Sequence, residues 1–196
     1  NLACLSRGAT AIYPNDAFDP LSTLQTVQDE KCTGLHGVPT MFIGELDCAQ
    51  FNEFDLSSLR TGIMAGAPCP TEVMKRVLGD MHMRDILIAY GQTETSPVNH
   101  ITLPDDSLEN RTGTVGKAVP WVEIKITDES NRVLPVGEKG EICVRGYSVM
   151  QGYWNDEERT RETIDAANWL HSGDLGVMDA NGYVQVVGRI KDMVIR

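Results

Sequence analysis

The residues with the clearest chemical meaning are five consecutive ones that follow a short apolar run. Tyr90-Gly91-Gln92-Thr93-Glu94 come directly after residues 86–89, which read ILIA. A glycine lets a backbone approach a ligand closely, a threonine hydroxyl can hydrogen-bond a phosphate oxygen, and a glutamate is a hard oxygen ligand for Mg²⁺. The pattern therefore predicts a strand that presents these groups to a nucleoside triphosphate and its metal, although a turn that needs glycine only for its backbone angles would look similar.

Later segments place further glycines, acids and basic residues along the chain. They read GEICVRG at 140–146, GYW at 152–154, WLHSGDLG at 169–176 and GRIKD at 188–192. In this order and with this spacing, together with residues 90–94, they resemble the adenylate-forming superfamily, which includes acyl-CoA and aryl-CoA synthetases, peptide-synthetase adenylation domains and firefly luciferase. The stretches HGVPTMF at 36–42, AGAP at 65–68 and RGYSVMQGYW at 145–154 are similar to medium-chain fatty acyl-CoA synthetases in particular.

The resemblance implies an AMP-forming acid–thiol ligase. Such an enzyme joins a carboxylate to the α-phosphate of ATP, releases pyrophosphate, and transfers the acyl group from the acyl-adenylate to the thiol of coenzyme A. ATP, Mg²⁺ and coenzyme A are then the expected cofactors and co-substrates, and a fatty acid is the expected substrate. Both steps depend chiefly on alignment and electrostatic stabilisation, which suits a sequence without a convincing Ser/His/Asp arrangement. An aryl-CoA ligase or another adenylate-forming enzyme is the near alternative, and a non-catalytic nucleotide-binding module is the alternative from another class.

The same resemblance assigns roles to single residues. Glu94 is expected to bind the metal and Thr93 a phosphate, and these two form the expected catalytic pair. The expected nucleotide contacts are Gly66, Ala67, Pro68, Tyr90, Gly91, Gln92, Thr93, Asp174 and Arg189. Asp174, in a glycine-flanked loop, would accept hydrogen bonds from ribose hydroxyls, and Tyr90 would lie against the adenine. A turn aspartate, a packed rim tyrosine and a surface arginine are the plainer explanations of these residues.

The acyl group is expected to contact small and aliphatic residues, and we name His36, Gly37, Val38 and Ser96 as its pocket. A histidine beside apolar neighbours is more often simply packed, so the role of His36 stays open. Lys191 matches the hinge at which these enzymes rotate a carboxy-terminal domain, and a solvated lysine would have the same sequence.

Alternating strand and helix signals must position the first of these groups. We expect strands at 11–13, around Leu35, at 62–65 and at 86–89, and helices that begin at Pro20, at Pro39 and after the 66–68 turn. Such alternation predicts a parallel sheet with flanking helices, in which ligands bind beyond the carboxyl ends of the strands.

Beyond about residue 115 the apolar residues alternate, as at 122–126, and Asn181-Gly182 is a hairpin signal. These features predict a small, distorted β-barrel. The expected domains are a partial α/β subdomain at 1–115, a barrel-like subdomain at 116–188 and the start of a hinge at 189–196. Together they would be a fragment of the large amino-terminal domain of an adenylate-forming enzyme. Because a lysine-ended phosphate loop and a carboxy-terminal domain are missing from the sequence, we expect this fragment alone to be inactive.

Composition narrows the classes of partner. The 196 residues are 41% hydrophobic, and 17 basic against 28 acidic side chains give a formal net charge of −11. An acidic surface repels a phosphate backbone, so the expected partners are small molecules and not nucleic acid. No apolar run is long enough for a transmembrane segment. Five cysteines without a C-x-x-C pair favour an intracellular, reducing compartment, without distinguishing cytoplasm, mitochondrion and peroxisome.

Overall fold

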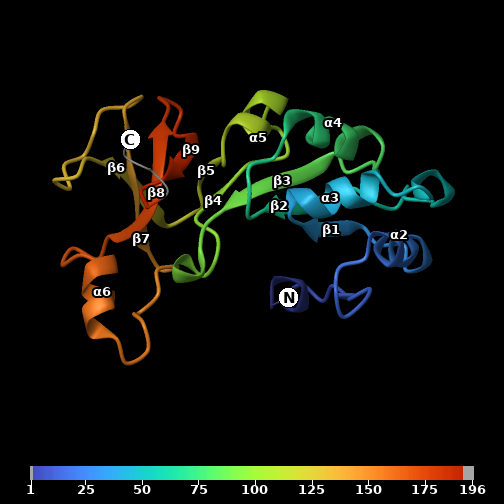
Figure 1. The fold of residues 1–196 in the computed structure, drawn as a ribbon, viewed down its shortest axis with the longest axis horizontal. Coiled ribbons are helices and arrows are strands. Elements are labelled where there is room, and N and C mark those ends of the chain that lie inside the picture. Colours follow the sequence, from blue (N-terminus) through green and yellow to red (C-terminus); the bar gives the residue numbers. More distant parts are fainter. Residues whose placement is uncertain (1, 192–196) are drawn as a thin grey trace.

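Two β-sheets lie side by side in the computed structural model, which describes residues 2–191 (Figure 1). The first sheet has the order β1-β2-β3-β4-β5, and the second has the order β6-β7-β8-β9. The strands of the first are β1 (Gly34–Gly37), β2 (Thr61–Ala65), β3 (Asp85–Tyr90), β4 (His100–Ile101) and β5 (Lys117–Ala118). Those of the second are β6 (Val122–Thr127), β7 (Lys139–Gly146), β8 (Leu170–Met178) and β9 (Val184–Arg189).

Helices surround the first sheet, and one helix lies at an end of the second (Figure 1). The α-helices are α1 (Leu2–Ser6), α2 (Pro20–Asp29), α3 (Pro39–Leu46), α4 (Thr71–Gly79), α5 (Leu108–Gly113) and α6 (Glu157–Thr163). Two short 3₁₀ helices, η1 (Phe51–Glu53) and η2 (Thr93–Thr95), follow α3 and β3. The mixed α/β architecture with a second, antiparallel unit confirms the predicted fold class.

Local sequence explains where the helices form. Helix α2 begins where the carboxylate of Asp19 accepts a hydrogen bond from Ser22 N at 2.7 Å and Pro20 occupies the first turn, as its sequence predicts. Its buried Leu24 and Val27 lie on one face. Helix α4 buries Val73, Met74 and Val77 in the same way, so the 3.6-residue period was a sound guide in this part of the chain.

The parallel part of the first sheet sets the position of the site. Strands β1, β2 and β3 run parallel, with Ala65 opposite Ala89 at their carboxyl ends, while β4 and β5 are antiparallel additions. Because parallel strands end at the same edge, the 66–68 turn and the 91–94 segment leave the sheet side by side. This is the arrangement that the sequence predicted for these two segments.

The predicted strand at 11–13 was wrong. Residues 9–15 have no regular structure, and Ile12 and Tyr13 are 38% and 66% exposed. An apolar triplet becomes a strand only where a neighbouring strand can pair with it, and a single short run in the sequence does not reveal such a neighbour.

The second sheet is an antiparallel meander with its own hydrophobic core. Val122, Ile126, Ile142, Val144 and Val184 are buried in it. Within residues 2–191 the sheet pairs β6 with β7, β7 with β8 and β8 with β9, so the unit predicted as a small barrel has here the form of a four-stranded sheet. The predicted hairpin signal is confirmed, because Asp179 Oδ1 accepts hydrogen bonds from Asn181 N and Tyr183 N, each at 2.8 Å, in the turn between β8 and β9.

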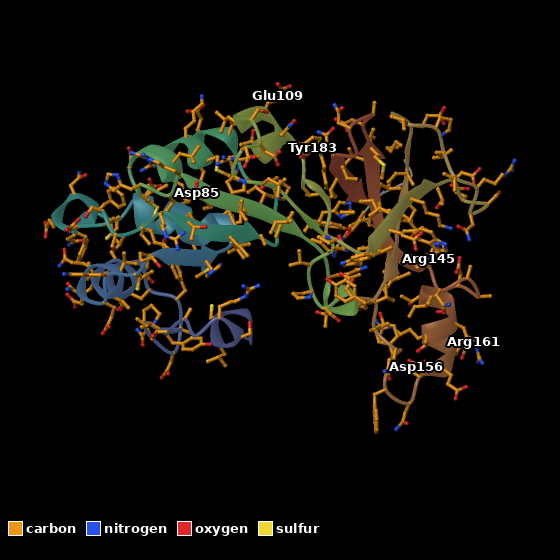
Figure 2. The ribbon with its side chains drawn as sticks, turned by 180° about the vertical axis from the view of Figure 1, so that it is seen from behind. Asp85, Glu109, Arg145, Asp156, Arg161 and Tyr183 are labelled. Carbon is orange, nitrogen blue, oxygen red and sulfur yellow. The ribbon has the colours of Figure 1, made fainter. Side chains whose placement is uncertain are left out.

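Hydrogen bonds join the two sheets at several points. Val115 N donates to Val184 O at 2.8 Å, and Val184 N donates to Gly116 O at 3.0 Å. The Tyr183 hydroxyl donates to Asp106 Oδ1 at 2.5 Å, and Figure 2 shows Tyr183 at this junction. Main-chain bonds therefore hold the start of β9 against the segment that follows α5, and the side-chain bond ties the preceding residue to the segment before α5.

Candidate active site

A cleft of about 740 Å³ lies between the two sheets. Residues of both sheets line it, so neither sheet could form it alone. The lining residues fall in the segments 65–69, 88–91, 97–98, 111–115 and 185–189, with Asp174 between them. Of the expected nucleotide contacts, Gly66, Ala67, Pro68, Tyr90, Gly91, Asp174 and Arg189 line this cleft.

Asp174 is the buried carboxylate of the cleft, with 4% of its surface exposed. Its Oδ2 accepts a hydrogen bond from the Tyr90 hydroxyl at 2.6 Å, and its Oδ1 accepts one from Arg189 Nε at 2.8 Å. The expectation that Asp174 lies in a loop was wrong, because the residue is inside β8 and pairs with Arg189, the last residue of β9. Gly173, which precedes Asp174, has a left-handed φ of +72°, a conformation typical of turns, and this glycine is the reason that the sequence indicated a loop. Each carboxylate oxygen has a second lone pair, so Asp174 can still accept hydrogen bonds from a ligand.

Tyr90 presents a neutral hydroxyl to this carboxylate. Burial and the adjacent Asp174 raise the pKa of the Tyr90 hydroxyl above its ordinary value. On its other side the ring packs against His100, with 5.7 Å between the ring centroids and 55° between the planes. Burial lowers the pKa of His100 to about 4, so this imidazole is neutral at neutral pH. The Tyr90 side chain thus contacts a neutral imidazole through its ring and a carboxylate through its hydroxyl.

The turn after β2 brings main-chain groups into the cleft. Gly66 has φ +89°, a left-handed conformation that a side chain disfavours. A Cβ on Gly66 would also lie 3.3 Å from Val38 Cγ1, so the turn passes close to the residue that precedes α3. This turn can therefore offer peptide groups to a flat ligand, which is the role expected of 66–68.

Gly91 has a reason within the protein for being glycine. A Cβ there would lie 2.0 Å from the carbonyl oxygen of Pro97. The sequence suggested that Gly91 allows a ligand to approach. The structure shows that it allows the 97–98 segment to approach, so that both segments line the cleft together.

Thr93 and Glu94 lie beside the cleft and not among its lining residues. Both are in η2, which begins three residues after β3 ends, and Thr93 is exposed. Glu94 Oε1 accepts a hydrogen bond from the Tyr153 hydroxyl at 2.8 Å, and Glu94 O accepts one from Met150 N at 2.9 Å. Gln92, at the start of η2, donates its N–H to Thr95 Oγ1 at 3.1 Å. Glu94 is therefore a partly buried carboxylate next to the 146–154 loop of the second unit.

The expected acyl-pocket and hinge residues are more scattered. His36, Val38 and Ser96 are exposed, Gly37 is half-buried, and none of the four lines the cleft. Val38 is nevertheless the neighbour of Gly66, so one predicted acyl contact adjoins one predicted nucleotide contact. Lys191 is exposed, and the remainder of the expected hinge, 192–196, lies outside the described residues.

Sequence reasoning missed the segment 111–115 on the cleft wall. Its sequence RTGTV is rich in threonine and glycine, residue types that often contact phosphates and could have indicated a binding segment. The segment lies, however, where the apolar periodicity changes from that of helices to that of strands. The buried guanidinium of Arg111 donates to the carbonyls of Arg84, Pro104 and Asp106. Arg111 therefore braces this wall of the cleft.

The sequence matches a family model described as AMP-binding enzyme over residues 1–154. Among curated proteins, YngI of Bacillus subtilis is 54% identical over 196 residues, which is all of this chain and 36% of the relative. Acyl-CoA ligase sidI of Aspergillus fumigatus is 44% identical across all of this chain and 34% of its own length. The mitochondrial medium-chain acyl-CoA ligase ACSF2 of Danio rerio is 44% identical across 96% of this chain and 31% of its own length. The chain thus spans about a third of the length of these relatives.

Solved structures share the fold. The anthranilate CoA ligase AuaEII in complex with anthranoyl-AMP matches with a TM-score of 0.86 and 30% identity, over 95% of this chain and 36% of its own. The o-succinylbenzoate coenzyme A synthetase MenE from Bacillus subtilis, in complex with ATP and magnesium ion, matches with a TM-score of 0.85 and 27% identity, over 99% and 39%. In the described residues, no helix of this chain is both long and apolar enough to cross a membrane.

Proposed function

The chain belongs to the family of AMP-binding enzymes, and from that membership we propose that it is the nucleotide-binding part of an acyl-CoA synthetase. The proposed reaction joins a carboxylic acid to the α-phosphate of ATP and then transfers the acyl group to coenzyme A. The observation that supports this proposal most directly is the buried Asp174, which Tyr90 and Arg189 hold at the edge of a cleft formed by both sheets.

The cleft suggests how the nucleotide would bind. The adenine would lie along the 66–68 turn beside the Tyr90 ring, and the ribose hydroxyls would donate to the free lone pairs of Asp174. Arg189, whose side chain is 65% exposed, would lie beside the ribose and phosphates, where the positive charge of its guanidinium attracts their oxygens.

The phosphates would lie next to η2. Thr93 has an exposed hydroxyl-bearing side chain there, and the carboxylate of Glu94 is of the type that binds Mg²⁺, so the residues present fit this ion. When bound, the ion would neutralise phosphate charge. The protein's own contribution would be the fixed direction of Glu94, which Tyr153 holds. Lys191 would lie at the hinge about which adenylate-forming enzymes rotate their carboxy-terminal domain.

For the acid we propose a medium-chain fatty acid. The ACSF2 relatives bear that substrate class in their names, and the exposed aliphatic Val38 lies against Gly66 of the nucleotide turn. His36, Gly37 and Ser96 stay part of the proposed acyl pocket. An aromatic acid is the second candidate, because AuaEII, an anthranilate CoA ligase, shares the fold.

Nucleotide binding can be tested on the chain itself by calorimetric titration with AMP. We expect Asp174→Ala to weaken AMP binding by at least ~10-fold, since the ribose loses a charged acceptor. Asp105→Ala is the matched control, because Asp105 is exposed and outside the cleft. Equal AMP affinity in wild type and Asp174→Ala would remove Asp174 from the ribose site.

Catalysis requires a protein of the relatives' length, so we would substitute this chain for the matching third of YngI and measure acid-dependent pyrophosphate release. Glu94→Gln should lower Mg²⁺-dependent release by about two orders of magnitude, the scale of losing one key electrostatic contact. The exposed Glu129→Gln should leave this release unchanged.

A comparison of octanoate and anthranilate in the same assay separates the two acid classes, and turnover with anthranilate alone would reject the fatty-acid proposal. A chimera that binds AMP but releases no pyrophosphate with any acid would favour a non-catalytic nucleotide module.

A further inference from the structure

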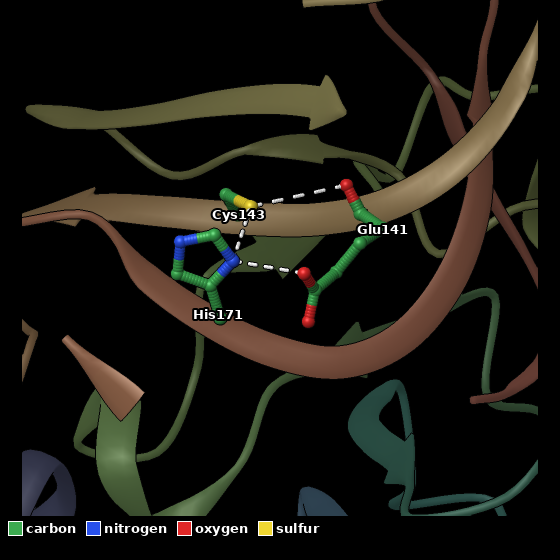
Figure 3. A group of neighbouring side chains, drawn as sticks. All are labelled: Glu141, Cys143 and His171. Atoms are coloured by element: carbon green, nitrogen blue, oxygen red, sulfur yellow. Dashed lines mark hydrogen bonds and ion pairs between the residues drawn. The ribbon is translucent and has the colours of Figure 1, made fainter. Parts of the chain in front are cut away.

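Three potential metal ligands converge on the second sheet, and none of the three is among the residues proposed to bind the nucleotide. Glu141 and Cys143 come from β7 and His171 comes from the neighbouring β8, and their side chains point toward one another (Figure 3). Their ligand atoms all lie within 4.8 Å of one another. Cys143 is fully buried, while the side chains of His171 and Glu141 are 22% and 18% exposed, so the cluster is shielded but reachable from solvent.

One ring nitrogen faces two partners. His171 Nδ1 lies 2.8 Å from Glu141 Oε2 and 3.5 Å from Cys143 Sγ. An imidazole nitrogen has either one proton or one lone pair, so it cannot hydrogen-bond well to a carboxylate and a thiol at once. A cation between the three atoms would contact the nitrogen, the sulfur and the oxygen together.

Each of the three side chains also has an outer partner that fixes its direction. Gly173 N donates to Glu141 Oε1 at 2.9 Å, which leaves Oε2 facing the cluster. Asp165 Oδ2 lies 3.7 Å from His171 Nε2, and Thr127 Oγ1 lies 3.5 Å from Cys143 Sγ. A carboxylate behind the second ring nitrogen of a histidine is the usual arrangement around protein-bound metals, because it orients the ring and increases its basicity.

We propose that Glu141, Cys143 and His171 form a binding site for a zinc-class divalent cation. A thiolate, an imidazole and a carboxylate are a borderline-soft set that suits Zn²⁺ and not Mg²⁺, which takes oxygen ligands. Three protein ligands leave a fourth position for water or a small anion. Since the main chain of Gly173 holds Glu141, a bound ion would also stiffen the residue next to Asp174.

A nucleophilic role for Cys143 does not fit these contacts. Cys143 has no exposed surface, and a substrate would have no path to its sulfur. A small ion needs only the gap that the partly exposed carboxylate and imidazole leave. Among the described residues, Lys125 and Arg145 lie on neighbouring positions and hydrogen-bond other groups, because Lys125 Nζ donates to Asn131 Oδ1 and Arg145 forms a two-point pair with Glu123.

The test is a titration of the 196-residue chain with Co²⁺, which substitutes for Zn²⁺ and absorbs light when a thiolate binds it. We expect one equivalent to produce thiolate-to-cobalt charge-transfer absorption, which added Zn²⁺ abolishes and excess Mg²⁺ leaves unchanged. Cys143→Ser should remove this absorption. Cys69→Ser, which alters another buried cysteine in the core of the first sheet, should keep it.

Further variants keep the Cys143 thiol, and circular dichroism shows whether each is folded, so that lost Co²⁺ binding can be distinguished from misfolding. His171→Gln and Glu141→Gln should each weaken Co²⁺ binding on the order of 100-fold with an unchanged circular dichroism spectrum, and Asp165→Asn should weaken it by roughly 10- to 100-fold. A wild-type chain without charge-transfer absorption would overturn the proposal. The same absorption in Cys143→Ser, or unchanged Co²⁺ affinity in both ligand variants, would also overturn it.

Discussion

At the scale of single residues, the hydrogen bond between Tyr90 and Asp174 joins the two sheets inside the cleft. Its length of 2.6 Å and the burial of Asp174 make it a charge-assisted bond of the stronger kind. A residue expected to stack on a ligand therefore also orients the carboxylate expected to bind the same ligand.

We expect Tyr90→Phe to lower the free energy of unfolding by about 1–3 kcal/mol, because Asp174 Oδ2 then stays buried with one partner fewer. Urea unfolding at pH 7 measures this loss. The control is Tyr147→Phe, since Tyr147 is 74% exposed, and it should unfold like wild type. An unchanged unfolding midpoint for Tyr90→Phe would show that this bond contributes little.

Glu45 supplies a prediction about pH. Its side chain is buried in α3, and Oε2 has no hydrogen-bond partner among the described residues. Burial raises the pKa of Glu45 to about 8 from an ordinary value of 4.5. Between these two pH values the folded state keeps a proton that the unfolded state releases, so Glu45 makes the protein less stable as pH rises from about 4.5 to 8.

Glu45→Gln should remove this part of the pH dependence and stabilise the fold at pH 7 by an amount on the order of 1–3 kcal/mol. Urea midpoints at pH 5, 6, 7 and 8 give the comparison, with the exposed Glu53→Gln as the control. Parallel stability curves for wild type and Glu45→Gln across this range would contradict the prediction.

At the scale of elements, the residue that follows β3 packs closely against another main-chain segment, and both line the cleft. Gly91→Ala would force a methyl group to within 2.0 Å of Pro97 O, so the 91 and 97–98 segments must separate. We expect a loss of stability of roughly 1–3 kcal/mol and weaker AMP binding, because both segments line the cleft. Gly79→Ala at the end of α4 is the control, since a Cβ there meets nothing within 4 Å and should be neutral or slightly stabilising. Wild-type AMP affinity in Gly91→Ala would show that the two segments can separate without cost to the site.

The sequence predicted those elements whose signals are local. The cap at Asp19, the 3.6-residue spacing of Val73 and Val77 and the Asn181-Gly182 turn each fix structure within a few residues, and these predictions were confirmed. The strand at 11–13 failed because pairing is not local. The same limit hid the place of Asp174 inside β8, which depends on the distant β9.

The candidate site was predictable in part for the same reason. Residues 66–68 and 90–91 follow parallel strands whose carboxyl ends must meet, so their convergence could be expected. The contribution of residues 111–115 depends on how β9 docks after α5, through Val115 and Val184, and no periodicity in the sequence encodes that contact. The roles of Thr93, Glu94 and the acyl-pocket residues stay predictions.

At the scale of the whole molecule, the cleft is a shared property of two sheets with separate cores. A ligand that fills it contacts both sheets and stabilises the folded state by mass action. We expect AMP at ~100 times its dissociation constant to increase the unfolding free energy by about 2.7 kcal/mol. Hydrogen exchange should show slower exchange of amides in β3 and in β9 alike.

The same measurement on Asp174→Ala serves as the control, and a variant that binds AMP at least ~10-fold more weakly should gain no more than about 1.4 kcal/mol at that AMP concentration. Protection confined to β3 would place the ligand on the first sheet alone and would exclude a shared site.

The bracing by Arg111 also determines where the chain can be re-engineered. The guanidinium of Arg111 donates to main-chain carbonyls at 84, 104 and 106, so it holds the chain between residues 104 and 111 in one conformation beside β3. An epitope tag or new termini created by circular permutation within that stretch would loosen one wall of the cleft. The exposed turn at 135–138, where Gly137 has open space around it, should accept the same insertion with the binding surface intact.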